Sequence, residues 1–337
     1  MTTHALAPSA TSGEVEEPTA MRDAQLRPIV VGVDGSKESE LALDWAVDEA
    51  RRRGLSLHLV HAHALAASMS PAPHGAPTSW HDPGWVLRAA RERVAILGVD
   101  HSVDLVVTDE DVLVTAATAL VAASAGADTV VVGTHRHGAL EAALLGSTSL
   151  RVASNAACPV VVVRRPASRD VAHPQIVIGV DGSPESADAL AYAFHRASDQ
   201  GLPLTVISAW AGDVDVEALR VTDAVADEVR AATVNARLVA LRRAVGPWRE
   251  KFPDVRVHTI VAAGRPADVL VDESWAAELV VVGSHGRGSF RGLLLGSVSE
   301  DVLHRAHCPV AVVRSMAPDD AVSPQPQSPP SPGSVSP

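Results

Sequence analysis

The chain has 337 residues, of which 47% are hydrophobic, and it carries a formal net charge of −12 at pH 7. This length corresponds to about two domains of ordinary size, and the acidic balance argues against a nucleic-acid-binding protein, which would need a basic stripe. The apolar runs fall short of the ~20 residues of a membrane-spanning helix, and the first residues lack the pattern of a signal peptide. We therefore expect a cytoplasmic protein with no nucleic-acid or membrane partner.

The two ends of the chain differ in composition from the rest. Residues 1–26 and 316–337 lack apolar periodicity, and the second segment ends in SPQPQSPPSPGSVSP. Segments of this kind cannot bury enough apolar surface to offset the entropy lost on ordering. The sequence therefore predicts two disordered tails.

Between the tails, one module occurs twice. The stretch IVVGVDGSKESELALDWA returns 147 residues later as IVIGVDGSPESADALAYA. A glycine-rich stretch and the segment CPVVVVR both return 150 residues later, the latter as CPVAVVR. Because the landmarks keep their order and nearly their spacing, we interpret the chain as a tandem duplication. The predicted domains are residues 27–165 and 176–315, joined by a linker at 166–175.

Each copy alternates short runs of β-branched residues with helical stretches. In the first copy, strands are expected near 29–34, 56–62, 103–108, 129–133 and 159–164, and helices near 38–53, 85–98, 113–126 and 147–156. The second copy repeats this order with a longer second helix near 217–245. Nearly continuous valine and isoleucine runs between helices are typical of parallel strands covered on both faces. With right-handed crossovers, this predicts an α/β fold of two tandem doubly wound domains, each with a five-stranded parallel sheet.

A glycine-rich loop follows the fourth strand of the second copy, with the spacing G-x-x-G-x9-G-S. Gly283 and Gly286 leave backbone N–H groups uncovered, as in an anion-binding concavity. Gly296 and Ser297 open a helix, whose first N–H groups and dipole favour phosphate oxygens. An alternative stays open here, because Glu300 lies three residues after Ser297 and the two could form a simple capping box.

An acid accompanies this loop. Asp181 follows the first strand of the second copy, and Ser183-Pro184 behind it is a strong helix-start signal. If the first and fourth strands are neighbours, Asp181 lies beside the glycine loop, where doubly wound sheets bind ligands. A carboxylate suits ribose hydroxyls or an amino group of a base, and backbone amides suit phosphates. Together the two features predict a nucleotide site.

Several other nucleotide-binding and catalytic motifs are absent from the sequence. The chain contains no GxxxxGK[ST] motif, no GxGxxG after its first strand, and no GxSxG nucleophile elbow. His61 and His63 fall on one face of an expected strand, but no third ligand has a fixed place beside them. We therefore predict no P-loop, no dinucleotide fingerprint, no catalytic residues and no metal site of the protein's own.

At this point the motifs match a known family. The sequence over about residues 27–315 resembles the universal stress protein family, in the tandem two-domain form common in actinobacteria. The resemblance rests on Val-Asp-Gly-Ser after the first strand, on G-x-x-G-x9-G-[ST], and on Cys-Pro-Val before the fifth strand. It implies an adenine-nucleotide alpha-hydrolase-like fold with strand order 3-2-1-4-5, and ATP binding with Mg²⁺. It also implies pairing through the fifth strands, either in a homodimer or between the two domains of one chain.

The resemblance also implies site residues, position by position. In the second copy these are Gly179, Asp181, Gly283, Gly286, Arg287, Gly288, Gly296, Ser297 and Val298. In the first copy they are Gly32, Asp34, Gly133, Gly146, Ser147 and Thr148. The first copy departs from the pattern, because Arg136 replaces Gly286 and Val114-Thr115-Ala116 replaces Gly264-Arg265-Pro266. The Arg136 side chain could point outward or contact phosphate, so we expect the second copy to be the better site.

Three functions compete on this evidence. The first is an ATP-binding, regulatory stress-response protein whose hydrolysis is slow or absent, because no general base or arginine finger has an evident position. The second is an ATP-using transferase, which would need an acceptor pocket that the sequence does not supply. The third is a dimerisation or interaction module that binds no nucleotide.

Overall fold

The computed structural model describes residues 27–64, 84–108, 115–134, 145–164, 174–210, 223–286 and 295–314. Both predicted tails lie outside the described residues, as do Arg136, Arg287 and Gly288. The first half of the chain contains strands β1 Ile29–Gly32, β2 Leu57–Ala64, β3 His101–Thr108, β4 Thr129–Gly133 and β5 Val160–Val163. Its helices are α1 Lys37–Arg53, α3 Trp85–Leu97, α4 Ala116–Ser124 and α5 Ser147–Asn155.

The second half repeats this arrangement. Its strands are β6 Gln175–Gly179, β7 Leu204–Trp210, β8 Val257–Ala263, β9 Ala277–Gly283 and β10 Val310–Val313. Its helices are α6 Pro184–Gln200, α8 Asp223–Lys251, α9 Pro266–Glu273 and α10 Ser297–Arg305, with a short 3₁₀ turn η2 Ser274–Ala276. Within each half the strands are parallel, in the order β3-β2-β1-β4-β5 and β8-β7-β6-β9-β10. The predicted fold class and the strand order 3-2-1-4-5 are confirmed.

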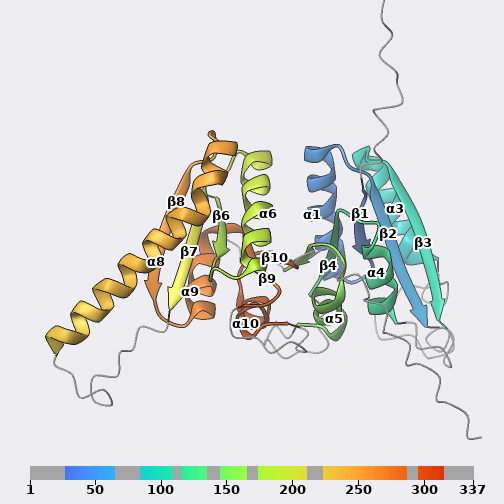
Figure 1. Ribbon diagram of the computed structural model, residues 1–337. Coiled ribbons are helices and arrows are strands. Elements are labelled where there is room, and N and C mark those ends of the chain that lie inside the picture. The colour runs from blue at the N-terminus through green and yellow to red at the C-terminus, as the bar shows by residue number, and fades with distance from the viewer. Residues whose placement is uncertain are drawn as a thin grey trace, which may run out of the picture.

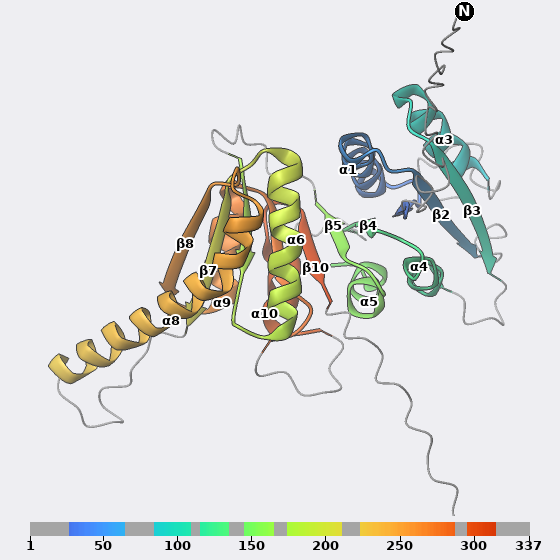
Figure 2. The same ribbon diagram turned by 45° about the horizontal axis from the view of Figure 1, so that its top comes forward.

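The two halves share one ten-stranded sheet (Figure 1), joined where β5 and β10 pair antiparallel (Figure 2). At this junction Val161 lies opposite Ala311, and Val160 opposite Val312. Since residue 311 is the counterpart of residue 161 at the repeat offset of 150, the junction has a pseudo-twofold register. The chain therefore pairs its own fifth strands, which is one of the two arrangements that the sequence left open.

Helices cover both faces of this sheet. Helices α1, α3, α6 and α8 pack on one face, and α4, α5, α9 and α10 pack on the other (Figures 1 and 2). Each face has a single hydrophobic core that continues from one half of the chain into the other. The central strands β4, β5, β9 and β10 are buried on both sides and consist largely of valine, as is typical of a covered parallel sheet, whereas the edge strand β8 is partly exposed.

Helix α8 differs from its prediction, because it continues to Lys251 through Gly246 and Pro247. Proline in a helix interior removes a hydrogen bond and usually ends or kinks the helix. Here the turn after Pro247 is held by aromatic packing, since Trp248 and Phe252 both stack on the buried Phe194 of α6. The first turns of α8 extend beyond the sheet (Figure 2).

None of the helices that the structure describes is both long and apolar enough to cross a bilayer.

Candidate functional site

Each half of the molecule contains a cavity at the carboxyl ends of its first and fourth strands. The cavity of the second half has a volume of about 410 Å³, and that of the first half about 380 Å³. Both lie within the roughly 300–1,000 Å³ range of small-molecule sites. Every predicted site residue that the structure describes lines one of them. In the second cavity these are Gly179, Asp181, Gly283, Gly286, Gly296, Ser297 and Val298; in the first, Gly32, Asp34, Gly133, Gly146, Ser147 and Thr148.

In the second cavity, strand pairing brings the acid to the glycine loop. Strand β6 lies beside β9, so the residues that follow these strands meet at one edge of the sheet. A Cβ atom added to Gly286 would lie 2.8 Å from Oδ2 of Asp181. The other carboxylate oxygen of Asp181, Oδ1, accepts a hydrogen bond of 2.9 Å from the backbone N–H of Ser183. The turn therefore fixes the acid in place at the rim.

The two helices that begin at this cavity are capped differently. Ser183 is the N-cap of α6, and its hydroxyl accepts from the N–H of Ser186 at 3.1 Å. Helix α10 begins at Ser297 with Gly296 as its N-cap, which has no side chain to accept a hydrogen bond. The alternative of a capping box at Ser297 is therefore wrong, since Ser297 is the first helical residue. The start of α10 faces the cavity without a side-chain cap, as an anion site requires.

One predicted contact is not available. The N–H of Gly296 donates to the carbonyl of Ser284 at 2.8 Å, which closes the glycine loop on itself. This amide is therefore occupied by the protein, and Gly296 can contribute only close approach of its backbone. The first-turn amides of Ser297 and Val298 remain the candidates for holding an anion.

The rest of the second cavity is largely apolar. Ile207, Ala209, Leu270 and Val282 line it. The missing side chain of Gly179 makes room for Leu270, because a Cβ there would lie 2.7 Å from the Cδ1 atom of that leucine. Gly179 thus shapes the wall of the cavity by allowing a leucine to pack against the strand end.

Sequence reasoning missed a cation at this cavity. Arg237, on the long helix α8, lines the cavity, and its guanidinium donates to the hydroxyl of Ser208 at 3.4 Å. His285, in the glycine loop, lines it too, with Nδ1 3.1 Å from the Ser284 hydroxyl. Arg237 carries no motif, and only the packing of α8 brings it to the sheet edge. The unusual length of the second helix was the one signal that set this segment apart.

The first cavity has the same plan. Asp34 accepts from the N–H of Ser36 at 2.9 Å, and Gly146 is the uncapped N-cap of α5. Gly133 ends β4 in contact with the start of α1, where a Cβ would lie 2.4 Å from the carbonyl oxygen of Glu38. Only glycine allows this approach, so the strand-end glycine is required by packing as well as by position.

The two cavities differ in charge. Among the described residues that line the first cavity, Asp34 and Glu38 are both acids and no base is present. The second cavity combines Asp181 with Arg237. A polyphosphate is attracted to a cation and repelled by two carboxylates. The second cavity therefore suits an anionic ligand better than the first.

The neighbouring helix starts differ as well. Thr115 begins α4 with a complete capping box, in which Thr115 and Thr118 each bond the other's backbone N–H. In the second half, α9 begins at Pro266 with Arg265 as an N-cap that makes no side-chain cap. Gly264 before it has φ +136°, a conformation that favours glycine. Val114 of the first-half loop lies outside the described residues, so the two loops are compared here only at the helix starts.

His61 and the two cysteines are buried in the protein and have roles in packing. Nδ1 of the buried His61 lies 2.7 Å from the carbonyl of Val33. Within the described residues, no group of three or more histidine, cysteine or acidic side chains is placed to hold a metal ion. Cys158 and Cys308 are buried free thiols, and burial raises the pKa of each to about 12.

Comparison with known proteins agrees with this architecture. A family model described as the universal stress protein family matches residues 25–164 and again 173–314. A universal stress protein of Mycobacterium tuberculosis is 40% identical over 293 residues, which cover 85% of this chain and 96% of that protein. A relative from Mycolicibacterium smegmatis is 39% identical over 293 residues, with the same shares of the two chains.

A solved structure shares the fold. The universal stress protein from Archaeoglobus fulgidus superposes with a TM-score of 0.60 at 19% identity, covering 85% of this chain and 96% of that one. The likeness extends over both halves of the chain. With two matches of the family model and relatives at 40% identity over most of its length, this chain belongs to the universal stress protein family, whose domain it contains twice in tandem.

Proposed function

We propose that this protein is an ATP-binding universal stress protein that acts as a nucleotide sensor, and that the cavity of the second half is its principal site. The observation that carries the proposal is the convergence of Asp181, the glycine loop and the uncapped start of α10 on one cavity of about 410 Å³. The three features come from separate segments of the sequence, and the pairing of β6 with β9 brings these segments together.

Each part of the cavity matches a part of the nucleotide. The apolar wall of Ile207, Ala209 and Leu270 suits an adenine ring, and the Asp181 carboxylate suits ribose hydroxyls. The start of α10 and Arg237 suit phosphate oxygens, since both offer positive potential and N–H donors. Mg²⁺ would be bound chiefly by the phosphates, as is usual for this ion, with the exposed Ser297 as a candidate hydroxyl ligand.

The residues that line the second cavity favour binding of ATP over its hydrolysis. The described polar groups at the second cavity fix and neutralise the ligand, and Asp181 is already engaged with the helix start through Ser183. Occupancy would then act through conformation: a ligand stabilises whichever arrangement of loop and helices it binds best. We infer that hydrolysis is slow or absent and that the bound nucleotide is the signal.

The direct test is the identification of small molecules released from freshly purified protein by heat denaturation, using mass spectrometry. We expect an adenine nucleotide in the supernatant. Added Mg-ATP at about 100 times its Kd should raise the Tm of nucleotide-free protein by roughly 5–10 °C. Absence of both results would overturn the proposal and leave an interaction module without nucleotide. Rapid ATP turnover in the presence of an acceptor would instead indicate a transferase.

A further inference from the structure

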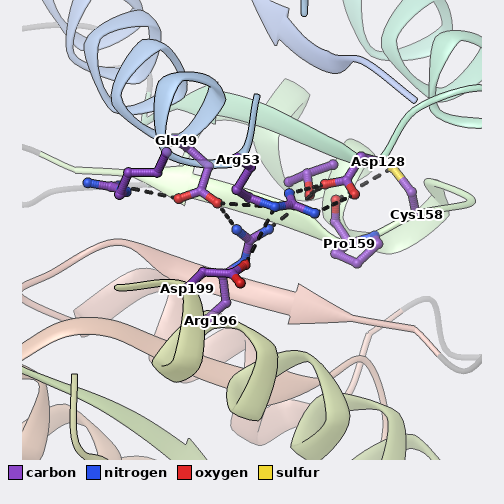
Figure 3. Close-up of polar contacts among 9 residues, drawn as sticks. Glu49, Arg53, Asp128, Cys158, Pro159, Arg196 and Asp199 are labelled. Atoms are coloured by element: carbon purple, nitrogen blue, oxygen red, sulfur yellow. Dashed lines mark hydrogen bonds and ion pairs between the residues drawn. The ribbon is translucent and has the colours of Figure 1, made fainter. Parts of the chain in front are cut away.

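Two opposite charges meet where the halves of the molecule pack together. Glu49 on α1 and Arg196 on α6 form an ion pair across the junction, and the two residues are 1% and 2% exposed (Figure 3). Few charged side chains are buried to this degree in proteins unless they are paired. The pair joins the first half of the chain directly to the second.

Further charges surround the pair. Arg53 makes two hydrogen bonds to Asp128, of 2.5 and 2.8 Å, and lies 3.6 Å from Asp199 of the other half (Figure 3). Arg196 in turn lies 3.9 Å from Asp128. Burial lowers the pKa of Arg196 to about 10, and nearby Asp199 opposes this shift. The guanidinium therefore stays charged at neutral pH.

Glu49 and Arg196 occupy the same position in the two copies. The offset between the copies in this region is 147 residues, which places residue 196 at the counterpart of residue 49. Their contact therefore lies on the pseudo-twofold axis, as does the pairing of Val161 with its counterpart Ala311. At such a point, a domain that paired with another copy of itself would bring the residue against its own duplicate.

The strand pairing and the arginine–carbonyl contacts across the junction do not distinguish the halves. The strands that pair are VVVV and VAVV, and main-chain hydrogen bonds would form equally between two copies of either. Arg164 donates to the carbonyl of Ala306 near the end of α10, and its counterpart Arg314 donates to the carbonyl of Ser154 near the end of α5. Because each half supplies both an arginine and a backbone acceptor, these contacts fit any pairing of domains.

The central position behaves differently. Two first domains would bury Glu49 against a second glutamate, and two second domains would bury Arg196 against a second arginine. Like charges facing each other in a buried site repel, and no attraction across the junction offsets their lost hydration. Only the combination of a first with a second domain places opposite charges at this position, where Glu49 also has ion pairs of 3.3 and 3.7 Å to Arg52 and Arg53 of its own helix.

We propose that the Glu49–Arg196 pair is a specificity determinant for domain pairing: it accepts the other half of the chain and rejects a like domain from a second copy. Either strand edge could otherwise pair with the same edge of a second molecule. The charge pair thus restricts a symmetric pairing surface to one partner. This inference does not depend on nucleotide binding.

The test uses full-length chains carrying Glu49→Arg, Arg196→Glu, or both changes. Each single change places like charges in the junction and should lower Tm by about 5–15 °C. The double change transposes the two residues with their total volume conserved. It should restore part of the loss, because opposite charges again meet across the junction while an arginine at position 49 lies beside Arg52 and Arg53. Asp48→Arg is the matched control, because it makes the same charge change at the exposed neighbouring position and should leave Tm nearly unchanged. A double change no better than the worse single change would overturn the proposal.

A second measurement reads pairing directly and does not need either single variant to be stable alone. Differently tagged chains, one with Glu49→Arg and the other with Arg196→Glu, are co-expressed, and the complexes are weighed by native mass spectrometry. In this mixture the complementary charge is present only on the other chain. The yield of a complex containing one of each chain should exceed that of two tagged wild-type chains by at least about tenfold. An equal yield in the two experiments would also overturn the proposal.

Discussion

Asp181 and Gly286 lie 105 residues apart in the sequence, yet a side chain as small as alanine at Gly286 would contact the Asp181 carboxylate, with 2.8 Å between Cβ and Oδ2. The contact exists because β6 and β9 are neighbours and both end at this edge of the sheet. The acid and the glycine loop therefore form one rim, and a change in either should be felt at the other.

The first prediction concerns this rim. Gly286→Val should displace the Asp181 carboxylate and fill part of the cavity, and it should weaken Mg-ATP binding by at least about tenfold in isothermal titration calorimetry. Gly246→Ala is the control, because no atom lies within 4 Å of the added Cβ and the residue is in the interior of α8. The control should keep the wild-type affinity. Unchanged affinity in Gly286→Val would contradict the placement of the ligand at this rim.

The second prediction separates the charge of the acid from its role in the turn. Asp181→Asn keeps an oxygen that can accept from the Ser183 N–H, so the turn should persist while the carboxylate charge is lost. Nucleotide affinity should fall by roughly tenfold or more, as for the loss of a charged hydrogen-bond partner. Asp34→Asn makes the same change in the first cavity. It should have the smaller effect on total binding, and the reverse order would show that the first cavity is the main site.

The third prediction concerns stability. Gly133→Ala places a Cβ 2.4 Å from the carbonyl oxygen of Glu38, a backbone atom that cannot rotate away. The free energy of unfolding should fall by about 1–3 kcal/mol or more, measured in urea. Gly126→Ala adds the same methyl group where no atom lies within 4 Å, and it should change stability by less than about 1 kcal/mol. Similar urea midpoints for the two variants would contradict the close packing of α1 on β4.

The fourth prediction follows from the raised thiol pKa values. Because burial holds the pKa of Cys158 and Cys308 at about 12, only about one thiol in ten thousand is ionised at pH 8. Iodoacetamide, which reacts with the thiolate, should therefore label native protein far more slowly than glutathione. Labelling should accelerate as pH rises, and it should reach two equivalents per chain in denaturant. Rapid labelling of native protein at pH 8 would mean that the thiols are accessible.

Local sequence patterns were enough to predict most of the secondary structure and the location of the candidate site. The repeated strands and helices follow from valine runs and amphipathic spacing, which depend on residues close together in the chain. The starts of α6 and α10 were predicted by Ser183-Pro184 and by Gly296-Ser297 for the same reason. The acid and the glycine loop were located because every parallel strand delivers the residue after it to the same edge of the sheet.

The tertiary structure decided what depends on packing between distant segments. Arg237 reaches the cavity only through the way α8 crosses the sheet, and Gly179 is needed for a leucine 91 residues away in sequence. The Gly296 amide, expected to be open, is bound by Ser284. Glu49 and Arg196 are ordinary helix charges when considered singly, and they become a buried pair only because β5 meets β10 and brings α1 to α6. Periodicity reports which face of an element is buried, whereas the partner of that face is set by long-range contacts.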